Sequence, residues 1–411
     1  MRVGIIGGSI AGLCAAHELL KVGADVHVFE RSTGALEDRG AGIGLDPSTL
    51  NYLIENDALD GYLMKDTHTV LGGDDQMLWR VPGEFASTCW DLLYAGLRRQ
   101  VPDERYTSGA NLEQLELSSR SVTATFTGRG RHEFDLVVCA DGADSQGRQL
   151  LFPDAQPQFA GYVAVRGLVE ESALGGLTAN DVWPIYEEAL IRYLVPKSHV
   201  IMYMVPGRDI QNEGLKPGSR RLNWVWYVNV PEQELASLTT DREGNSRRLS
   251  MPPGMMSDTN RASLLSLAED LFPGTFLEVI KATPAMFQQT IYSCMPPAIS
   301  SGRVCLVGDA AHLCRPHVGS GSSLAIADGV ALAQAVEKHG DRVETALSDW
   351  GKERYPAVSA MVELSRHLGE GHQVRPHDWG AMSREQFEQW WAGMMQGKWV
   401  YFDARSDTSY R

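Results

Sequence analysis

The sequence predicts an α/β fold that combines a discontinuous domain on a parallel sheet, an inserted and largely antiparallel β-sheet domain, and C-terminal helices. Three observations favour this fold. A strand–helix–strand unit opens the chain, alternating apolar and polar residues dominate residues 157–297, and a second strand-to-helix unit begins after Gly302. Because the strand–helix pattern resumes only after the alternating segment, we expect the first domain to be assembled from separate stretches of chain.

The opening unit contains a short apolar strand at residues 2–6, a helix that begins near Ile10, and a second strand at residues 25–30. Parallel strands joined by one helix are connected with a right-handed crossover, so this unit predicts a parallel sheet. Asp46 and Pro47 predict the start of another helix, because aspartate caps helix N-termini and proline is favoured in the first turn.

The alternating segment predicts strands that have two distinct faces. In the stretch RLNWVWYVNV, Trp224 and Trp226 fall on one face of the strand, whereas Tyr227 falls on the other. The stretch WPIYEEALIRYLVP is interpreted as a hairpin of the same sheet.

These patterns divide the chain into three parts. The first domain is expected to comprise residues 1–70, 90–156 and 298–345. The inserted domain is expected to comprise residues 71–89 and 157–297, and residues 346–411 form a C-terminal helical segment.

Composition excludes several classes of partner. The chain has 411 residues, 43% of them hydrophobic, and a formal net charge of −15, which disfavours nucleic acid and anionic membrane surfaces. Its six cysteines form no C-x-x-C pair, so the sequence predicts neither a metal site nor a disulfide framework. We find no apolar run of the roughly 20 residues that a membrane span needs, and no signal peptide, so we expect a cytoplasmic protein.

The first glycine-rich stretch predicts a dinucleotide site. Gly7 to Gly12 (GGSIAG) follow a strand and open a helix, with Ser9 in place of the middle glycine of G-x-G-x-x-G. Such a turn directs backbone N–H groups and the helix dipole toward a pyrophosphate, and Glu30 at the end of the next strand is suited to accept from ribose hydroxyls. The alternative is a glycine-rich turn that binds no ligand.

Two later motifs also follow predicted strands. Asp141 begins the stretch DGADSQGR, and Asp309 ends a strand that precedes Gly319-Ser320-Gly321 and a helix. Asp309 is suited to bind a sugar hydroxyl, and the N-terminus of the helix that follows is suited to face an anionic or electron-rich ring edge. Taken alone, each motif is also compatible with a turn that binds nothing.

In this order and at these spacings, the three motifs resemble the flavoprotein aromatic hydroxylases, which are single-component FAD-dependent monooxygenases, across nearly the whole chain. Several further stretches are most similar to members that hydroxylate dihydroxypyridines: GAGIGLDP, WDLLYAGLRR, FAGYVAVRG, LNWVWYVNV and GDAAHLCRPH. One departure stands out, because this sequence has Cys89-Trp90 where many relatives place an arginine that helps bind the flavin.

The resemblance implies a bound FAD in a Rossmann-like domain, NADPH or NADH as a transient co-substrate, and a possible homodimer. It implies that Glu30 and Asp309 hold ribose hydroxyls, and that residues 316–321 lie beside the isoalloxazine ring. The implied cofactor-binding residues are Gly7, Ser9, Ile10, Ala11, Gly12, Glu30, Arg31, Gly42, Ile43, Asp141, Asp309, Pro316, Gly319, Ser320 and Gly321.

The activity that the resemblance implies is hydroxylation of an electron-rich aromatic or N-heteroaromatic ring, first a hydroxypyridine, by O₂ through a flavin C4a-hydroperoxide. An ionised ring hydroxyl makes the ring more reactive, so a base nearby would help. His199 and Tyr203 are candidates, because residues four apart on a strand share a face, and His317 is a third. A purely structural role for these residues stays open.

Neighbouring apolar side chains complete the expected substrate site. They are expected to form a slot for a flat ring, and comprise Met202, Met204, Trp224, Trp226 and Tyr227.

Other classes of protein remain to be distinguished. An FAD-dependent dehydrogenase or oxidase would carry the same motifs, and so would a non-catalytic FAD-binding sensor. A flavin-dependent halogenase is disfavoured, since its Trp-x-Trp-x-Ile-Pro signature is met here only at Trp224 and Trp226, and Val228-Asn229 replace the Ile-Pro pair.

Overall fold

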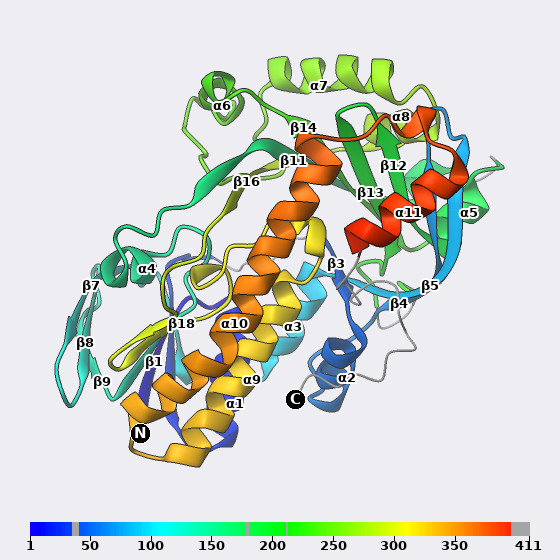
Figure 1. Ribbon diagram of the computed structural model, residues 1–411. Helices are drawn as coiled ribbons and strands as arrows, with labels where there is room; N and C mark the ends of the chain where they lie inside the picture. Colours follow the sequence, from blue (N-terminus) through cyan, green and yellow to red (C-terminus); the bar gives the residue numbers. More distant parts are fainter. Residues whose placement is uncertain (35–40, 178–180, 211–212, 396–411) are drawn as a thin grey trace.

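The computed structural model describes residues 1–34, 41–177, 181–210 and 213–395. It confirms the predicted α/β fold: one sheet with helices packed on it, a second and larger sheet, and helices toward the C-terminus (Figure 1). The last sixteen residues of the predicted C-terminal segment, 396–411, lie outside the described residues.

The first sheet brings distant parts of the sequence together. Among the described residues its strands follow the order β17 (Ser300–Ser301), β18 (Val304–Leu306), β10 (Leu136–Cys139), β1 (Arg2–Ile6), β2 (Asp25–Glu30) and β6 (Tyr106–Ser108). From β18 to β6 neighbouring strands are parallel, and Val138 pairs with Cys305. The carboxyl ends of β1, β2, β10 and β18 therefore meet at one edge, although three hundred residues separate the first from the last.

Among the described residues, long helices pack in layers on this sheet. They are α1 (Ile10–Lys21), α9 (Gly321–His339) and α10 (Val343–Gly369), and α9 packs against both α1 and α10 (Figure 1). A Cβ on Gly329 of α9 would lie 2.9 Å from the backbone nitrogen of Ala15, so the glycine permits this close helix contact.

The second sheet contains nine strands among the described residues, and its neighbours are antiparallel except for the β12–β4 pair. The strand order is β15 (Ser250–Met251), β16 (Phe287–Ser293), β11 (Gln158–Glu170), β14 (Arg221–Asn229), β13 (Ser198–Val205), β12 (Ala189–Val195), β4 (Leu63–Leu71), β5 (Met77–Cys89) and β3 (Gly42–Leu45). β3 and β4 thus join the second sheet, whereas the sequence predicts residues 1–70 as part of the first domain. The domain boundaries themselves stay a prediction.

The two faces of this sheet differ as the alternation predicts. Trp224 and Trp226 are fully buried and pack against α7 (Asp258–Leu271) and α8 (Thr275–Ala282), whereas Tyr227 faces the other way. Strand alternation likewise places Met202 and Met204 on the helix-covered face. The prediction that these two tryptophans and two methionines line a substrate slot is therefore wrong, because they form the core behind it.

The predicted hairpin at WPIYEEALIRYLVP is also wrong. Its first half forms helix α5 (Trp183–Glu188), and only the second half forms β12. Pro184 lies in the first turn, where its missing N–H costs nothing, and Trp183 and Tyr186 are three residues apart and both buried. The predicted helix start at Asp46 is confirmed, since Asp46 Oδ1 accepts from the Thr49 N–H at 3.0 Å.

The remaining elements complete the fold. They are the hairpin sheet β7 (Leu112–Leu117), β8 (Val122–Phe126) and β9 (Gly130–Phe134), and the helices α2 (Pro47–Glu55), α3 (Trp90–Arg99), α4 (Gln146–Leu151), α6 (Glu232–Leu238) and α11 (Arg384–Met395). None of the helices in the described part of the chain combines the length and the apolar character needed to cross a membrane.

Candidate active site

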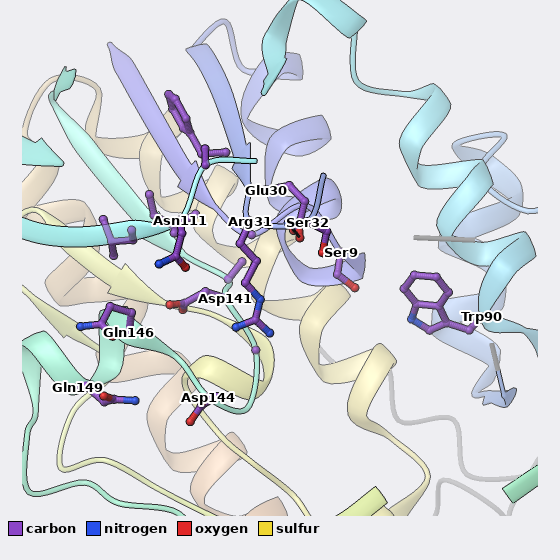
Figure 2. Close-up of a pocket in the computed structure, with 17 residues that line it drawn as sticks. Ser9, Glu30, Arg31, Ser32, Trp90, Asn111, Asp141, Asp144, Gln146 and Gln149 are labelled. Carbon is purple, nitrogen blue, oxygen red and sulfur yellow. Dashed lines mark hydrogen bonds between the residues drawn. The ribbon is translucent and has the colours of Figure 1, made fainter. Parts of the chain in front are cut away.

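A pocket of about 440 Å³ lies where the strands of the first sheet end. This motif pocket is lined by residues from the turns after β1, β2 and β10, among them Gly7, Ser9 and Asp141 (Figure 2). Gly7 has φ +105°, and a Cβ on it would lie 2.3 Å from the carbonyl oxygen of Ala140. Only glycine lets the turn after β1 come this close to β10.

Glu30 lies at the end of β2 with both carboxylate oxygens in use. Oε2 accepts from the Gly8 N–H and Oε1 from the Ser32 N–H, each at 2.8 Å. A carboxylate has about four acceptor sites, so Glu30 can still accept from two hydroxyl groups. Figure 2 shows Glu30, Ser32 and Ser9 close together, with Arg31 extending from β2 toward Asp141.

Asp141 organises the turn that follows β10. Its Oδ1 accepts from the Ser145 hydroxyl at 2.5 Å, and its Oδ2 accepts from the Gly147 N–H at 3.0 Å. Burial raises the pKa of Asp141, and these hydrogen bonds oppose the shift. The bonds hold the start of α4 beside the pocket.

Arg148 joins the second and third motifs. It is fully buried, and its guanidinium donates to the carbonyl oxygens of Asp309 at 3.2 Å, Ala310 at 3.1 Å and Ala143 at 2.6 Å. A guanidinium can bind several carbonyls at once because it carries five N–H groups. Arg148 is the last residue of the DGADSQGR motif, and only the fold shows that it binds the turn after β18.

A buried ion cluster lies directly beneath that turn. Asp328 on α9 accepts from Arg354 Nε and Nη2 at 2.9 and 2.8 Å and from the Gly308 N–H at 3.0 Å, and His312 Nε2 lies 2.6 Å from its Oδ2. Burial alone would lower the pKa of His312, but the Asp328 carboxylate outweighs it and raises that pKa to about 10. His312 is therefore a cation at neutral pH.

This ion cluster predicts a specific pH dependence of stability. The pKa of His312 rises from 6.5 to about 10 on folding, so the folded chain binds one more proton than the unfolded chain within that window. We expect the His312 contribution to the free energy of unfolding to be complete below pH 6.5 and to fall by up to about 1.4 kcal/mol per pH unit as pH rises toward 10. Urea titrations of the wild type and His312→Gln at several pH values measure it, and parallel slopes in the two proteins would contradict it.

A second pocket, of about 490 Å³, lies between the second sheet and the turn after β18. This sheet pocket shares Arg31 and Asp144 with the motif pocket, so the two adjoin. Its floor is the face of the second sheet that α7 and α8 do not cover, and residues 313–322 also line the pocket. The residues of the floor include Leu190, Ile201, Tyr203, Val225, Tyr227 and Ile291.

Most of the predicted site residues line one of the two pockets. The motif pocket is lined by Gly7, Ser9, Glu30, Arg31 and Asp141. The sheet pocket is lined by Tyr203, Arg31, Gly42, Ile43, Asp309, Pro316, His317, Gly319, Ser320 and Gly321. Ile10, Ala11, Gly12 and His199 line neither. The first three begin α1, where a Cβ on Gly12 would lie 1.9 Å from the Gly7 carbonyl oxygen.

His199 lies behind the wall of the sheet pocket. Its ring stacks on Tyr227 with centroids 4.4 Å apart, and its Nδ1 lies 2.9 Å from Gln373 Oε1. Burial lowers the pKa of His199 to about 3, so the ring is neutral. His317 does line the pocket, with Nε2 2.8 Å from the Tyr162 hydroxyl.

Cys89 and Trp90 lie at the start of α3, at the position where many relatives have an arginine. Cys89 is fully buried and accepts from Arg221 Nη2 at 2.8 Å. Trp90 lines the motif pocket and stacks on Tyr94, with ring centroids 4.9 Å apart. An indole therefore faces this pocket from α3 (Figure 2).

Two arginines are among the pocket residues that the sequence does not predict as site residues. Arg166 on β11 and Arg192 on β12 both face the sheet pocket. The sequence does contain a signal for both arginines. Each is the one charged residue in an otherwise apolar stretch of its strand, AVRGLV for Arg166 and ALIRYLV for Arg192.

Three sequence families match parts of the chain. An NAD(P)-binding Rossmann-like domain matches residues 5–35, an FAD-binding-domain-like family matches residues 159–293, and an FAD-binding domain matches residues 286–365.

Individual relatives match over almost the whole length. The 2,6-dihydroxypyridine 3-monooxygenase of Paenarthrobacter nicotinovorans is 32% identical over 91% of this chain and 93% of its own. The 6-hydroxynicotinate 3-monooxygenase of Pseudomonas fluorescens is 25% identical over 89% of this chain and 90% of its own. The solved 2,6-dihydroxypyridine-3-hydroxylase of Arthrobacter nicotinovorans superimposes with a TM-score of 0.83 at 29% identity, and covers 92% of this chain and 95% of its own.

The matches and the two adjoining pockets agree with the resemblance drawn from the three motifs. That interpretation is confirmed at the level of the family, the fold and the bound cofactor. The chain belongs to the FAD-binding monooxygenase family and is an enzyme of that class.

Proposed function

We propose that this enzyme uses NAD(P)H and O₂ to hydroxylate an electron-rich aromatic or N-heteroaromatic ring, with a hydroxypyridine as the first candidate. The observation that carries the proposal is the pair of adjoining pockets, of which one is built from dinucleotide motifs and the other has a flat apolar floor. The 32% identical relative supports a hydroxypyridine as the ring.

The residues present fit FAD. The cradle at Gly7 excludes any Cβ, Glu30 retains acceptor capacity, and Asp309 exposes its side chain in the sheet pocket. We infer that Glu30 and Asp309 bind the hydroxyl groups of FAD, and that Gly319 to Gly321 meet its ring system at the N-terminus of α9. Bound FAD would supply the redox chemistry, in which a hydride comes from NAD(P)H, one atom of O₂ goes to the ring and the other is reduced to water.

The sheet pocket positions the ring and keeps water away from it. Ile201, Val225 and Tyr227 offer a flat apolar surface on one side of the pocket. Tyr203 and His317 also line this pocket and contribute polar groups to it. Burial and the neighbouring histidines lower the pKa of His317 well below its usual value, so it acts as a neutral hydrogen-bonding group.

The test is NAD(P)H oxidation by the purified FAD-loaded enzyme, with and without 2,6-dihydroxypyridine and a small panel of phenols. Hydroxylated product and hydrogen peroxide are measured together, and NADH and NADPH are compared. We expect oxidation to be stimulated by the ring, with product formed in proportion. Peroxide formation that no ring stimulates would favour an oxidase, and an unresponsive flavoprotein would favour a sensor.

His199→Ala tests whether the residue behind Tyr227 contributes to the reaction. Because His199 stacks on Tyr227 and binds Gln373, we expect its loss to shift the pocket wall, preserve FAD content, and lower the product formed per NAD(P)H by a few-fold. His367→Ala, at an exposed position on α10, is the control. An unchanged ratio of product to NAD(P)H would remove His199 from the site.

A further inference from the structure

One ring nitrogen of His317 is bound to a buried phenol. Tyr162 on β11 is fully buried, and its hydroxyl oxygen lies 2.8 Å from His317 Nε2, although 155 residues separate the two in the chain. His317 lines the sheet pocket, whereas Tyr162 lines neither of the two pockets. We therefore expect Tyr162 to act on a ligand through its neighbour and not by direct contact.

Arg315 determines the direction of this hydrogen bond. A Cβ placed on Gly369 would lie 2.4 Å from the Tyr162 hydroxyl oxygen and 2.8 Å from Arg315 Nη1, so the two groups border the same small space. Burial raises the pKa of Tyr162, and the nearby charge of Arg315 opposes that rise. Because a guanidinium carries only donors, the phenol oxygen can accept on the side of Arg315, and the phenol hydrogen points at His317.

His317 is a neutral imidazole, with one nitrogen that donates and one that accepts. Burial and the neighbouring histidines and arginines lower its pKa well below its usual value. A ring nitrogen that accepts from a phenol cannot carry the single hydrogen of a neutral imidazole. With Nε2 as the acceptor, the hydrogen lies on Nδ1, which has no hydrogen-bond partner among the described residues.

The sheet pocket is where this hydrogen can find an acceptor. Tyr227 and His199 pack against the His317 ring, with centroids 4.6 and 5.1 Å from its own. The small part of His317 that stays exposed, 8%, belongs to a residue that lines the sheet pocket. A buried N–H without a partner destabilises the folded protein, and an oxygen atom of a bound ligand removes that penalty.

We propose that Tyr162 is a positioning residue for the hydroxylation. Its hydroxyl group holds His317 in the tautomer with the hydrogen on Nδ1, and His317 then donates to an oxygen atom of the ring substrate. The proposal rests on the proposed function, because it assumes that the ring occupies the sheet pocket. It adds a residue outside the pocket on which substrate binding depends, and it requires an acceptor oxygen on the ring.

The tautomer of His317 is measured by NMR of the oxidised FAD-loaded enzyme with ¹⁵N-labelled histidines, because protonated and unprotonated ring nitrogens have different chemical shifts. His317→Asn identifies the His317 signals by their loss. We expect the hydrogen on Nδ1 in the wild type and a loss of this preference in Tyr162→Phe. Tyr355→Phe is the matched control, since the Tyr355 hydroxyl on α10 also donates, to the Pro296 carbonyl oxygen at 3.1 Å, and Tyr355 lines neither pocket.

A second measurement tests whether Tyr162 acts through His317. The probe is the ring that the wild type binds most tightly among 2,6-dihydroxypyridine and the phenols, and its dissociation constant is measured without NAD(P)H through the change in flavin absorbance. We expect Tyr162→Phe to weaken binding by about threefold to tenfold, the usual effect of one hydrogen bond, and His317→Ala to weaken it at least as much.

The double variant Tyr162→Phe/His317→Ala should bind no more weakly than His317→Ala alone, because the effects of two residues that act as a unit do not add. His317→Asn keeps an N–H near the position of Nδ1, so it should restore most of the binding that His317→Ala loses. Tyr162→Phe should have no further effect in that background.

A hydrogen on Nε2 of His317 in the wild type, an unchanged tautomer in Tyr162→Phe, or additive effects of the two substitutions on binding would overturn the proposal. FAD content and thermal unfolding establish that each variant is folded, and the wild-type tautomer tests the proposal even where Tyr162→Phe does not fold. Failure of the hydroxylase function is distinguishable, because neither measurement requires turnover. The expected tautomer and non-additive binding without hydroxylated product would contradict only the proposed activity.

Discussion

Asp328→Asn is expected to lower the free energy of unfolding by about 3–5 kcal/mol, the largest stability effect that we predict. Asp328 is 1% exposed, and its carboxylate is bound by Arg354, by His312 and by the Gly308 N–H. Removing its charge takes this counter-charge from the buried Arg354 guanidinium, and it removes the group that raises the pKa of His312. The loss of a buried partner costs much more than the intact pair contributes, because desolvation of the remaining charge is no longer offset.

Urea unfolding followed by circular dichroism measures this effect at pH 7. Asp154→Asn is the matched control, since Asp154 is exposed and should change the free energy of unfolding by less than about 0.5 kcal/mol. Because Asp328 holds the Gly308 turn, we also expect the variant to bind FAD more weakly. A variant as stable as the wild type would show that the cluster is compensated elsewhere.

Asp309→Ala is expected to weaken FAD binding by about tenfold to a hundredfold while the protein stays folded. Hydrogen bonds from hydroxyl groups to a carboxylate contribute about 1.5–3 kcal/mol, which corresponds to that range of affinity. The fold should survive, because the Asp309 side chain is exposed in the sheet pocket and Arg148 holds the backbone through the Asp309 carbonyl oxygen.

The measurement is the dissociation constant of FAD from the apoprotein, followed by flavin fluorescence. Asp154→Ala serves as the control, and circular dichroism checks the fold of both variants. A full complement of tightly bound FAD in Asp309→Ala would show that the aspartate at the end of β18 is not a cofactor ligand.

Local patterns were sufficient for the elements that form the cofactor motifs. The strand at residues 2–6, the helix after Gly7, and the cap at Asp46 all depend on neighbours within a few residues, and the structure confirms them. The two-faced strand β14 was predicted equally well, because alternation is a property of a single strand.

The wrong predictions concern features that the sequence of a single strand does not determine. Alternation separates Trp224 from Tyr227, but it cannot say which face α7 and α8 cover, so the wrong face was assigned to the pocket. The segment that begins at Trp183 and Pro184 is a second example. Its local sequence is compatible with a helix as well as with a strand, and the burial of Trp183 and Tyr186 in the folded protein favours the helix.

The amino-acid sequence was sufficient to predict the family, the parallel sheet and the cofactor motifs that border the two pockets, because short motifs fix turn geometry through nearby backbone contacts. Three features become visible only in the folded chain: the ion cluster of Asp328, His312 and Arg354, the bonds of Arg148 to the turn after β18, and the two arginines of the sheet pocket. Each of these depends on segments that are far apart in the chain and meet only when the sheets are formed. The net charge of a pocket is the sum of the charges that several such segments contribute, so no local sequence pattern determines it.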